Sequence, residues 1–263
     1  MRSDPVILSK SFFPSLRLRG GGREQWRLVG GRARVPALKS PLVAAPLLAA
    51  LCLLAPILPV SAVEPGSRAS ETLVEIHTVD PTILIDLRYA TARNLFGHPI
   101  YPPGARAVIR QSVAQRLKVA QAYLHARGYG LKIWDAFRPF NAQGALWAFS
   151  KSARFVADPE NGRALHTWGA AIDATLVDAA GREVPMPSDF DSFSPAAALH
   201  YQGNDETIRR DLDLLLHAMG AAGFKGMHTE WWHFVAPDWS DFAAVAPDQA
   251  RIFTGAPAAI KTP

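Results

Sequence analysis

Hydrophobic and polar positions follow two different periods along residues 63–263. Apolar residues recur every three or four positions at 108–127 and at 205–222, which predicts two amphipathic helices. A third helix is predicted at 141–150, where Asn141 is a favourable N-cap. Short segments with an apolar or alternating pattern predict strands at 82–89, 131–135, 170–177 and 232–235.

These strands and helices follow one another without the regular alternation of a β-α-β fold. Their order predicts a single α+β domain in which helices back an antiparallel sheet. Two long loops, at 90–107 and 181–201, each contain three prolines. A loop as long as the second usually serves a binding or catalytic site.

Residues 1–62 have the order of a secretory leader. An arginine-rich stretch precedes an apolar run at 41–60 and then V-S-A, which has small residues where a signal peptidase cleaves. We therefore expect cleavage after Ala62, a mature domain of residues 63–263 and a periplasmic or secreted location. The alternative is a membrane anchor, but three prolines interrupt the run and its length only just reaches a bilayer span. We expect no stable membrane span after cleavage.

Charge and cysteine content change once this leader is set apart. The chain has 28 basic and 23 acidic residues, of which residues 1–62 hold nine and two, so the expected mature domain has a net charge of −2. A nucleic-acid partner is therefore not expected. The single cysteine, Cys52, also lies in the leader. Any metal in the mature domain must then be held by His, Asp or Glu side chains.

His166 and Asp173 are the first candidate metal ligands. They flank the segment T-W-G-A-A-I, in which Gly169 permits a tight bend before the predicted strand. An aspartate inside a buried strand needs a partner, because an unpaired buried charge is costly to desolvate. The alternative is a surface histidine together with an aspartate that is satisfied by a salt bridge.

Glu230 and His233, in the segment E-W-W-H, form the second candidate pair. Residues three apart face opposite sides of an ideal strand, so both address one metal only if the chain bends there or Glu230 lies at the strand mouth. Two adjacent tryptophans are typical of a pocket wall that excludes water. The alternatives are a core tryptophan pair beside an incidental histidine, and His228 as a rival ligand.

Together, His166, Asp173 and His233 would fill three corners of a tetrahedron and leave the fourth for water. An open fourth corner distinguishes catalytic from structural zinc sites. We therefore interpret these residues as a mononuclear zinc site. Glu230 would act as the general base for a water whose pKa the metal lowers.

Two further charged residues are candidates for substrate contacts. Arg138 follows a predicted strand in W-D-A-F-R-P, and its guanidinium is suited to stabilising an oxyanion. The alternative for Arg138 is an ion pair with Asp135 that stabilises the turn. Asp191 lies in M-P-S-D-F-D within the long loop, either as the acceptor of a substrate ammonium or as a solvated loop residue.

These segments together resemble the D-alanyl-D-alanine dipeptidases, the zinc enzymes of the vancomycin-resistance type, and their periplasmic relatives. The resemblance runs over residues 80–235 and rests on several motifs in the same order. These are D-L-R-Y-A-T-A-R-N-L-F-G-H-P-I-Y at 86–101, W-D-A-F-R-P at 134–139, H-x-x-G-x-A-I-D at 166–173, M-P-S-D-F-D at 186–191 and E-W-W-H-F at 230–234.

The resemblance implies hydrolysis of D-alanyl-D-alanine, a small free dipeptide, in the cell envelope, with one zinc ion per chain. The residues that it implies are His166, Asp173 and His233 as zinc ligands, Glu230 as general base, Arg138 at the transition state, and Asp191 and Tyr89 near the amino end of the substrate.

One position departs from the family pattern. Ala164 stands where the family commonly has a serine, two residues before the first ligand histidine, so a hydroxyl contact to substrate is missing or supplied elsewhere. Two other functions stay open. One is a zinc D,D-carboxypeptidase or endopeptidase that acts on peptidoglycan stems, and the other is a non-catalytic module that binds wall peptides.

Overall fold

The computed structural model describes residues 71–150, 152–161 and 164–254, so the predicted leader and Cys52 lie outside the described residues. Its main sheet has five strands in the order β2-β4-β5-β7-β6. These strands are β2 (Leu84–Ile85), β4 (Tyr129–Asp135), β5 (Ala171–Asp178), β6 (Lys225–Met227) and β7 (Glu230–Val235). A smaller sheet pairs β1 (Leu73–Glu75) with β3 (Val108–Arg110).

Most of the main sheet is antiparallel. Strand β5 pairs antiparallel with both β4 and β7, and β7 pairs antiparallel with β6. Strand β2 is the exception, because it runs parallel to β4 at one edge. The predicted α+β class with a helix-backed sheet is confirmed, with one parallel pair added.

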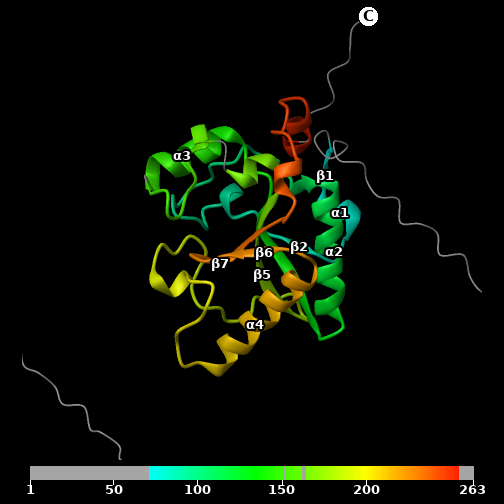
Figure 1. Ribbon diagram of the computed structural model, residues 1–263, viewed down its shortest axis with the longest axis vertical. Coiled ribbons are helices and arrows are strands. Elements are labelled where there is room, and N and C mark those ends of the chain that lie inside the picture. The colour runs from blue at the N-terminus through cyan, green and yellow to red at the C-terminus, as the bar shows by residue number, and fades with distance from the viewer. Residues whose placement is uncertain (1–70, 151, 162–163, 255–263) are drawn as a thin grey trace, which may run out of the picture. The chain divides into compact units, whose positions relative to one another are not determined.

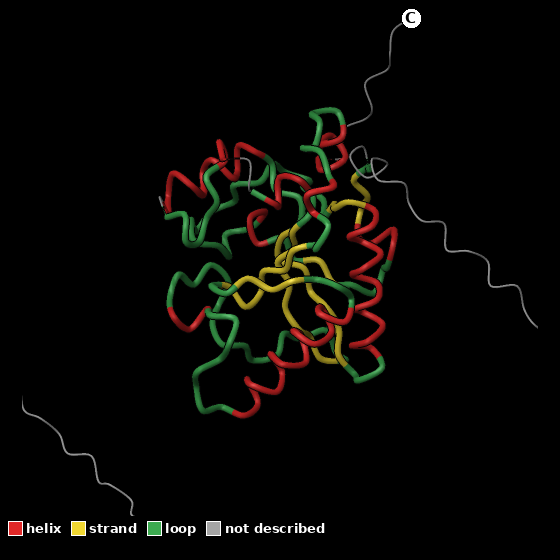
Figure 2. Tube along the Cα trace, viewed as in Figure 1, coloured by secondary structure: helices red, strands yellow, loops and turns green. Residues whose placement is uncertain are grey.

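Two long helices pack on this sheet. Helix α2 (Gln111–His125) packs on β4, and α4 (Glu206–Ala221) packs on β5, on β6 and on α2 (Figures 1 and 2). Helix α4 begins where the sequence predicts, because the Asp205 carboxylate accepts hydrogen bonds from the backbone N–H groups of Thr207 and Ile208. None of the helices in the described ranges is long and apolar enough to cross a bilayer.

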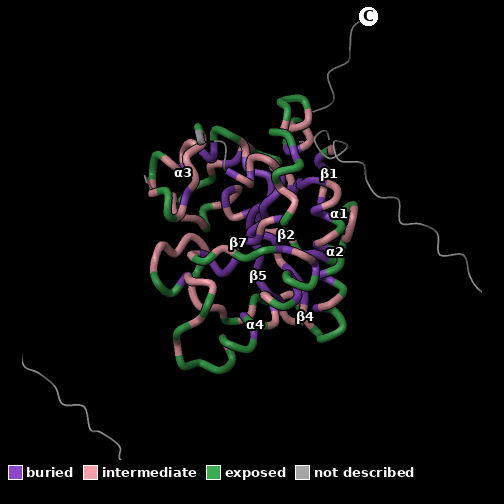
Figure 3. The backbone as a smooth tube through the Cα atoms, in the orientation of Figure 1, coloured by how far each residue is buried: buried purple, intermediate pink, exposed green. Residues whose placement is uncertain are grey.

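The main core lies between these helices and the sheet. Leu117 of α2 and Leu215 of α4 are fully buried, as are Ile172 and Leu176 of β5. Almost the whole of β5 is buried (Figure 3). Successive residues of a strand point to opposite faces. The residues of β5 that alternate with Ile172, among them Asp173, therefore face away from the helices and toward the loops on the other side of the sheet.

Three predicted boundaries are wrong. Residues 108–110 form β3 rather than the first turn of a helix, because they are fully buried and pair with β1. Helix α3 (Phe140–Ser150) begins before Asn141, which is therefore not its N-cap. The strand expected at 82–89 is reduced to β2, because a 3-10 turn (Arg88–Ala90) follows it. The first error has the clearest cause, since a pairing partner 35 residues away leaves no local signal.

Candidate active site

The register of the sheet places two candidate ligands side by side. Asp173 on β5 is paired directly with His233 on β7, and residues opposite one another in an antiparallel pair point to the same face. His166 comes from a 3-10 helix (Leu165–Trp168) that precedes β5. Gly169 ends that helix with φ +67°, a conformation that glycine adopts without strain. The expected bend is therefore observed, and it holds His166 at the entrance to β5.

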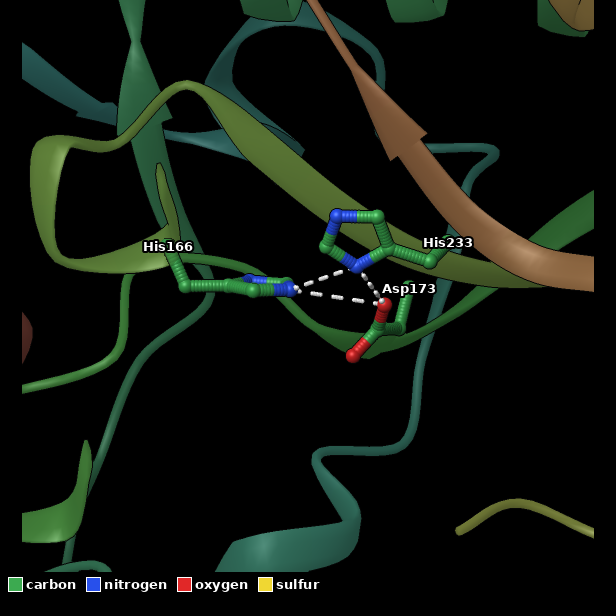
Figure 4. Close-up of side chains that lie close together, drawn as sticks. All are labelled: His166, Asp173 and His233. Atoms are coloured by element: carbon green, nitrogen blue, oxygen red, sulfur yellow. Dashed lines mark hydrogen bonds and ion pairs between the residues drawn. The ribbon is translucent and has the colours of Figure 1, made fainter. Parts of the chain in front are cut away.

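The three candidate ligand atoms converge on one point (Figure 4). His166 Nε2 lies 3.2 Å from His233 Nδ1 and 3.4 Å from Asp173 Oδ1. His233 Nδ1 lies 2.9 Å from Asp173 Oδ1. In a tetrahedral metal site with ligands at about 2.0–2.1 Å, neighbouring ligand atoms are about 3.3–3.4 Å apart. The three side chains therefore fit one divalent cation, and the rival His228 does not belong to the cluster.

The protonation of these groups also suits metal binding. His166 Nδ1 donates a hydrogen bond to the carbonyl oxygen of Ala136 at 2.7 Å, which leaves the Nε2 lone pair facing the cluster. Burial opposes the charge of Asp173, but the two histidines hold the pKa of its carboxyl group well below its usual range. Asp173 is thus a carboxylate, the form that coordinates a cation.

Glu230 lies at the mouth of β7. It is the first residue of that strand, and the pairing of β6 with β7 shifts register beside it. Its Oε2 is 3.9 Å from His233 Nδ1. The geometric condition that the sequence imposes on this pair is therefore met by the strand-mouth position. Burial raises the pKa of Glu230 to about 8; the charge of His233 opposes this rise, and those of Asp173 and Asp191 add to it.

Arg138 is buried beside the cluster. Its Nε donates to Asp135 Oδ2 at 2.9 Å, its Nη1 donates to Gln143 Oε1 at 2.9 Å, and its Nη2 lies 3.5 Å from Asp173 Oδ2. Burial opposes its charge, but Asp135 above all raises its pKa further. The ion pair with Asp135 is therefore present. The same guanidinium also lines the cavity that contains the metal cluster, by which we mean the three candidate ligands His166, Asp173 and His233.

Two residues that the sequence analysis did not single out orient this arginine. Tyr101 donates its hydroxyl to Asp135 Oδ1 at 2.5 Å. Gln143, from α3, donates through Nε2 to the carbonyl oxygen of Ala157 at 2.6 Å, which fixes the amide that holds Arg138. Tyr101 ends the first of the motifs quoted above, so a signal was present. A glutamine within a helix carries no such signal.

Asp191 and Tyr89 meet at one end of the cavity. The Tyr89 hydroxyl donates to Asp191 Oδ1 at 2.9 Å, whereas Asp191 Oδ2 is buried without a hydrogen-bond partner in the part of the chain that is described. Asp191 also has φ +58°, and it is the only described residue other than glycine with a positive φ. Backbone strain of this kind clusters at functional sites. Burial raises the pKa of Asp191 to about 7.

The three candidate ligands, Glu230, Arg138, Gln143, Tyr89 and Asp191 line one cavity of about 390 Å³. Trp232 forms part of its wall, whereas Trp231 packs against Trp134 in the core, so the tryptophan pair serves both roles proposed for it. Ala164 is buried and lines the cavity as well. The predicted residues found together there are Tyr89, Arg138, His166, Asp173, Asp191, Glu230 and His233.

Known proteins with similar sequences share one description. A family model described as D-ala-D-ala dipeptidase matches residues 69–252. The D-alanyl-D-alanine dipeptidase of Escherichia coli (strain K12) is 32% identical over 181 residues, which cover 69% of this chain and 92% of that protein. The D-alanyl-D-alanine dipeptidase of Enterococcus faecium is 29% identical over 181 residues, which cover 58% of this chain and 85% of that protein.

Proposed function

This chain is a metallopeptidase of the D-ala-D-ala dipeptidase family, and from that premise we propose that it hydrolyses D-alanyl-D-alanine with a bound zinc ion. The observation that carries the proposal is the convergence of three ligand atoms, all within 4.8 Å of one another, beside the buried carboxyl group of Glu230. A module that only binds wall peptides would need neither feature.

Zinc is the cation that we assign to His166, Asp173 and His233. Two imidazoles and one carboxylate, without a sulfur ligand, form a set that catalytic zinc sites use with the fourth position open. Zinc bound there would act as a Lewis acid and lower the pKa of the attacking water toward neutrality.

Glu230 moves the proton in this proposal. Burial raises the pKa of its carboxyl group to about 8, so this group can both accept and release a proton near that pH. Glu230 removes the proton from the attacking water and passes it to the nitrogen of the leaving amine. Arg138 donates an N–H to the carbonyl oxygen as that oxygen gains negative charge, and the bonds to Asp135 and Gln143 hold its guanidinium in place beforehand.

Asp191 and Tyr89 bind the amino end of the dipeptide in this proposal. The free Oδ2 of Asp191 lies buried in the cavity wall, where an ammonium group would supply the hydrogen bonds that it lacks. The Tyr89 hydroxyl donates a hydrogen bond to the carboxylate of Asp191 and so positions it. The centroid of the Tyr89 ring lies 5.0 Å from the guanidinium carbon of Arg138. The substrate carbonyl then lies between the amino subsite and the metal cluster.

Two loops close over this cavity and favour a short substrate. Phe155, from the segment before His166, stacks on Phe193 of the long loop, with ring centroids 4.9 Å apart and planes inclined by 20°. Both phenylalanines line the cavity, whose volume of about 390 Å³ is at the small end of the range for ligand sites. A free dipeptide fits such a space more readily than a peptidoglycan stem does.

We also propose that the reaction takes place in the cell envelope. The support is the leader-like order of residues 1–62, with an arginine-rich stretch, an apolar run and V-S-A at the expected cleavage position. The amino terminus of protein recovered from the exporting cell would test this. We expect it to begin after Ala62, and an intact leader on the active protein would contradict the proposal.

The experiment that tests the activity combines metal analysis with four substrates. Purified protein loaded with zinc is assayed on D-alanyl-D-alanine, on L-alanyl-L-alanine, and on a tripeptide and a pentapeptide stem that end in D-alanyl-D-alanine. We expect about one zinc per chain and hydrolysis of the D,D-dipeptide alone. Cleavage of the stem in preference to the dipeptide would assign a carboxypeptidase instead. Bound zinc without hydrolysis of any substrate would assign a binding module.

A further inference from the structure

A dipeptide is a zwitterion, so a pocket that accepts its ammonium must also accept its carboxylate. Three carboxyl groups line the cavity, those of Asp173, Asp191 and Glu230, and each repels a second carboxylate when it is ionised. Two side chains with permanent positive charge line it as well, Arg138 and Lys225. These two are the cationic candidates for the partner of the substrate carboxylate.

Arg138 is already engaged by protein groups, and the proposed mechanism assigns its remaining N–H to the substrate carbonyl oxygen. Both its Nε and its Nη2 pair with Asp135, its Nη1 bonds to Gln143, and its Nη2 also faces Asp173. Lys225 differs, because its ammonium forms no ion pair with any acidic side chain in the ranges that the structure describes. It is exposed and lines the cavity.

The register of the sheet aims Lys225 at the active site. Lys225 on β6 is paired directly with Val235 on β7, so the two side chains share a face of the sheet. Val235 lies two residues beyond His233 on the same strand, and therefore points to that same face. Val235 lines the cavity too. Lys225 thus stands on the same face of the sheet as the metal cluster.

The order of the strands places the two ends of the substrate. Tyr89 follows β2 at one edge of the sheet, Lys225 lies on β6 at the other edge, and the ligand strands β5 and β7 lie between them. Neighbouring strands are about 4.8 Å apart, so β6 is about 7 Å from the midpoint of β5 and β7. Lys225 is also two residues, or about 7 Å, further along the sheet than His233, which makes the separation about 10 Å. A D-alanyl residue and an extended lysine side chain together span that distance.

We propose that Lys225 binds the C-terminal carboxylate of the substrate and so sets the direction in which the dipeptide lies. The inference rests on the proposed dipeptidase function. The ammonium lies at Asp191, the scissile carbonyl beside the metal cluster, and the carboxylate at Lys225. Lys225 would thereby supply one substrate contact in a cavity where Ala164 provides no hydroxyl group.

The test compares a free acid with its amide. Lys225→Met keeps an apolar stem and removes the charge, and it is assayed on D-alanyl-D-alanine and on D-alanyl-D-alaninamide. We expect KM for the acid to rise about fivefold with kcat retained, as for a partly exposed ion pair, while KM for the amide stays unchanged. Raising the ionic strength should increase KM for the acid in the parent protein only. Lys225→Arg should restore most of the affinity for the acid.

Lys118→Met serves as the matched control, because Lys118 is exposed on α2 and does not line the cavity. An equal change for acid and amide, no change for either, or the same effect from Lys118→Met would overturn the assignment of Lys225. If the parent protein hydrolyses neither compound, the proposed function itself fails. Calorimetry then measures binding of the acid and the amide to the same variants. A Kd for the acid that rises about fivefold in Lys225→Met, with an unchanged Kd for the amide, would support the role of Lys225.

Discussion

Three carboxyl groups share the cavity, and their surroundings give them different properties. Two histidines hold the pKa of Asp173 well below its usual range, against the effect of burial. Burial raises the pKa of Glu230 to about 8 and that of Asp191 to about 7. Separated pKa values among neighbouring acids are how one site obtains a permanent anion and a proton carrier. The residue types alone do not distinguish these roles, because all three are ordinary acids in the sequence.

Replacement of Glu230 by glutamine tests the proton carrier. Glu230→Gln keeps the shape of the side chain but removes the group that takes and returns the proton, so we expect kcat to fall by about 10²–10⁴-fold. The zinc content should stay at the parent value, because Glu230 is not one of the three converging ligands. Glu183→Gln is the control, since Glu183 pairs with Arg88 and Lys132 outside the cavity. A fully active Glu230→Gln protein would refute the assignment.

Asp191 should make the stability of the metal-free protein depend on pH. An exposed aspartate has a pKa near 4, whereas burial raises that of Asp191 to about 7 in the folded protein. The folded state therefore holds this proton more tightly, and stability falls as the pH rises from about 4 to about 7. Asp191→Asn cannot ionise, so its free energy of unfolding should match that of the parent at pH 4 and exceed it by about 1–2 kcal/mol at pH 8.

Urea unfolding of both proteins at the two pH values measures this difference. The stabilised variant should at the same time bind D-alanyl-D-alanine more weakly, because it has lost the anion opposite the ammonium. A variant that is less stable than the parent at pH 8 would show that ionised Asp191 supports the fold rather than the substrate.

Short elements rather than long ones position the chemistry. His166 lies on a four-residue 3-10 helix, Glu230 opens a six-residue strand, and Lys225 opens a three-residue strand. The long helices α2 and α4 contribute no residue to the cavity wall. They cover the opposite face of the sheet, where α4 packs on β5, the strand whose pairing with β7 places Asp173 beside His233.

Gly169 is the position at which this arrangement is most sensitive to a backbone change. An alanine there would need φ +67°, and its Cβ would lie 2.7 Å from Leu73 Cδ2, which is buried. We expect Gly169→Ala to lower the free energy of unfolding by about 1–2 kcal/mol and to weaken zinc binding, because His166 lies in the turn that Gly169 ends.

Gly220→Ala is the matched control for this substitution. Gly220 lies inside α4, and an added Cβ there meets no atom within 4 Å. The same change should therefore stabilise the helix by about 0.5–1 kcal/mol. Thermal unfolding and zinc titration of the two variants separate the outcomes. Equal effects at both positions would show that the left-handed turn does not hold His166.

The fold as a whole brings together ligands that lie far apart along the chain. His166 and His233 are 67 residues apart, and their facing nitrogens are 3.2 Å apart. A cation that joins them therefore crosslinks the loop before β5 to the strand β7. Because the main hydrophobic core lies between the helices and the other face of the sheet, we expect the fold to persist without metal but to be less stable.

Removal of the metal tests this expectation. At free zinc 1,000-fold above its Kd, binding stabilises the folded state by about 4 kcal/mol, which corresponds to a rise in Tm of about 10 °C for a domain of this size. A chelator should reverse the rise and leave the far-ultraviolet circular dichroism unchanged. His233→Ala should lose the zinc-dependent shift, whereas His228→Ala should keep it. A shift that survives in His233→Ala would place the cation elsewhere.

Local sequence determined much of the fold and the identity of the site residues. The periodicity of α4, the strand at β5 and the bend at Gly169 were all predictable, because each depends on residues within one or two turns of chain. The motifs also singled out seven residues that line the cavity. Their roles in catalysis stay predictions until the substitutions above are assayed.

Only the tertiary structure decided what depends on distant partners. The pairing of β3 with β1 removed a turn from the predicted helix, and the register of β6 against β7 placed Lys225 on the face of the metal cluster. Burial, which no single segment contains, moved the pKa values of Glu230 and Asp191 toward neutrality. Strand pairing and burial both depend on residues that are far apart in the chain, and these residues come together only when the chain folds.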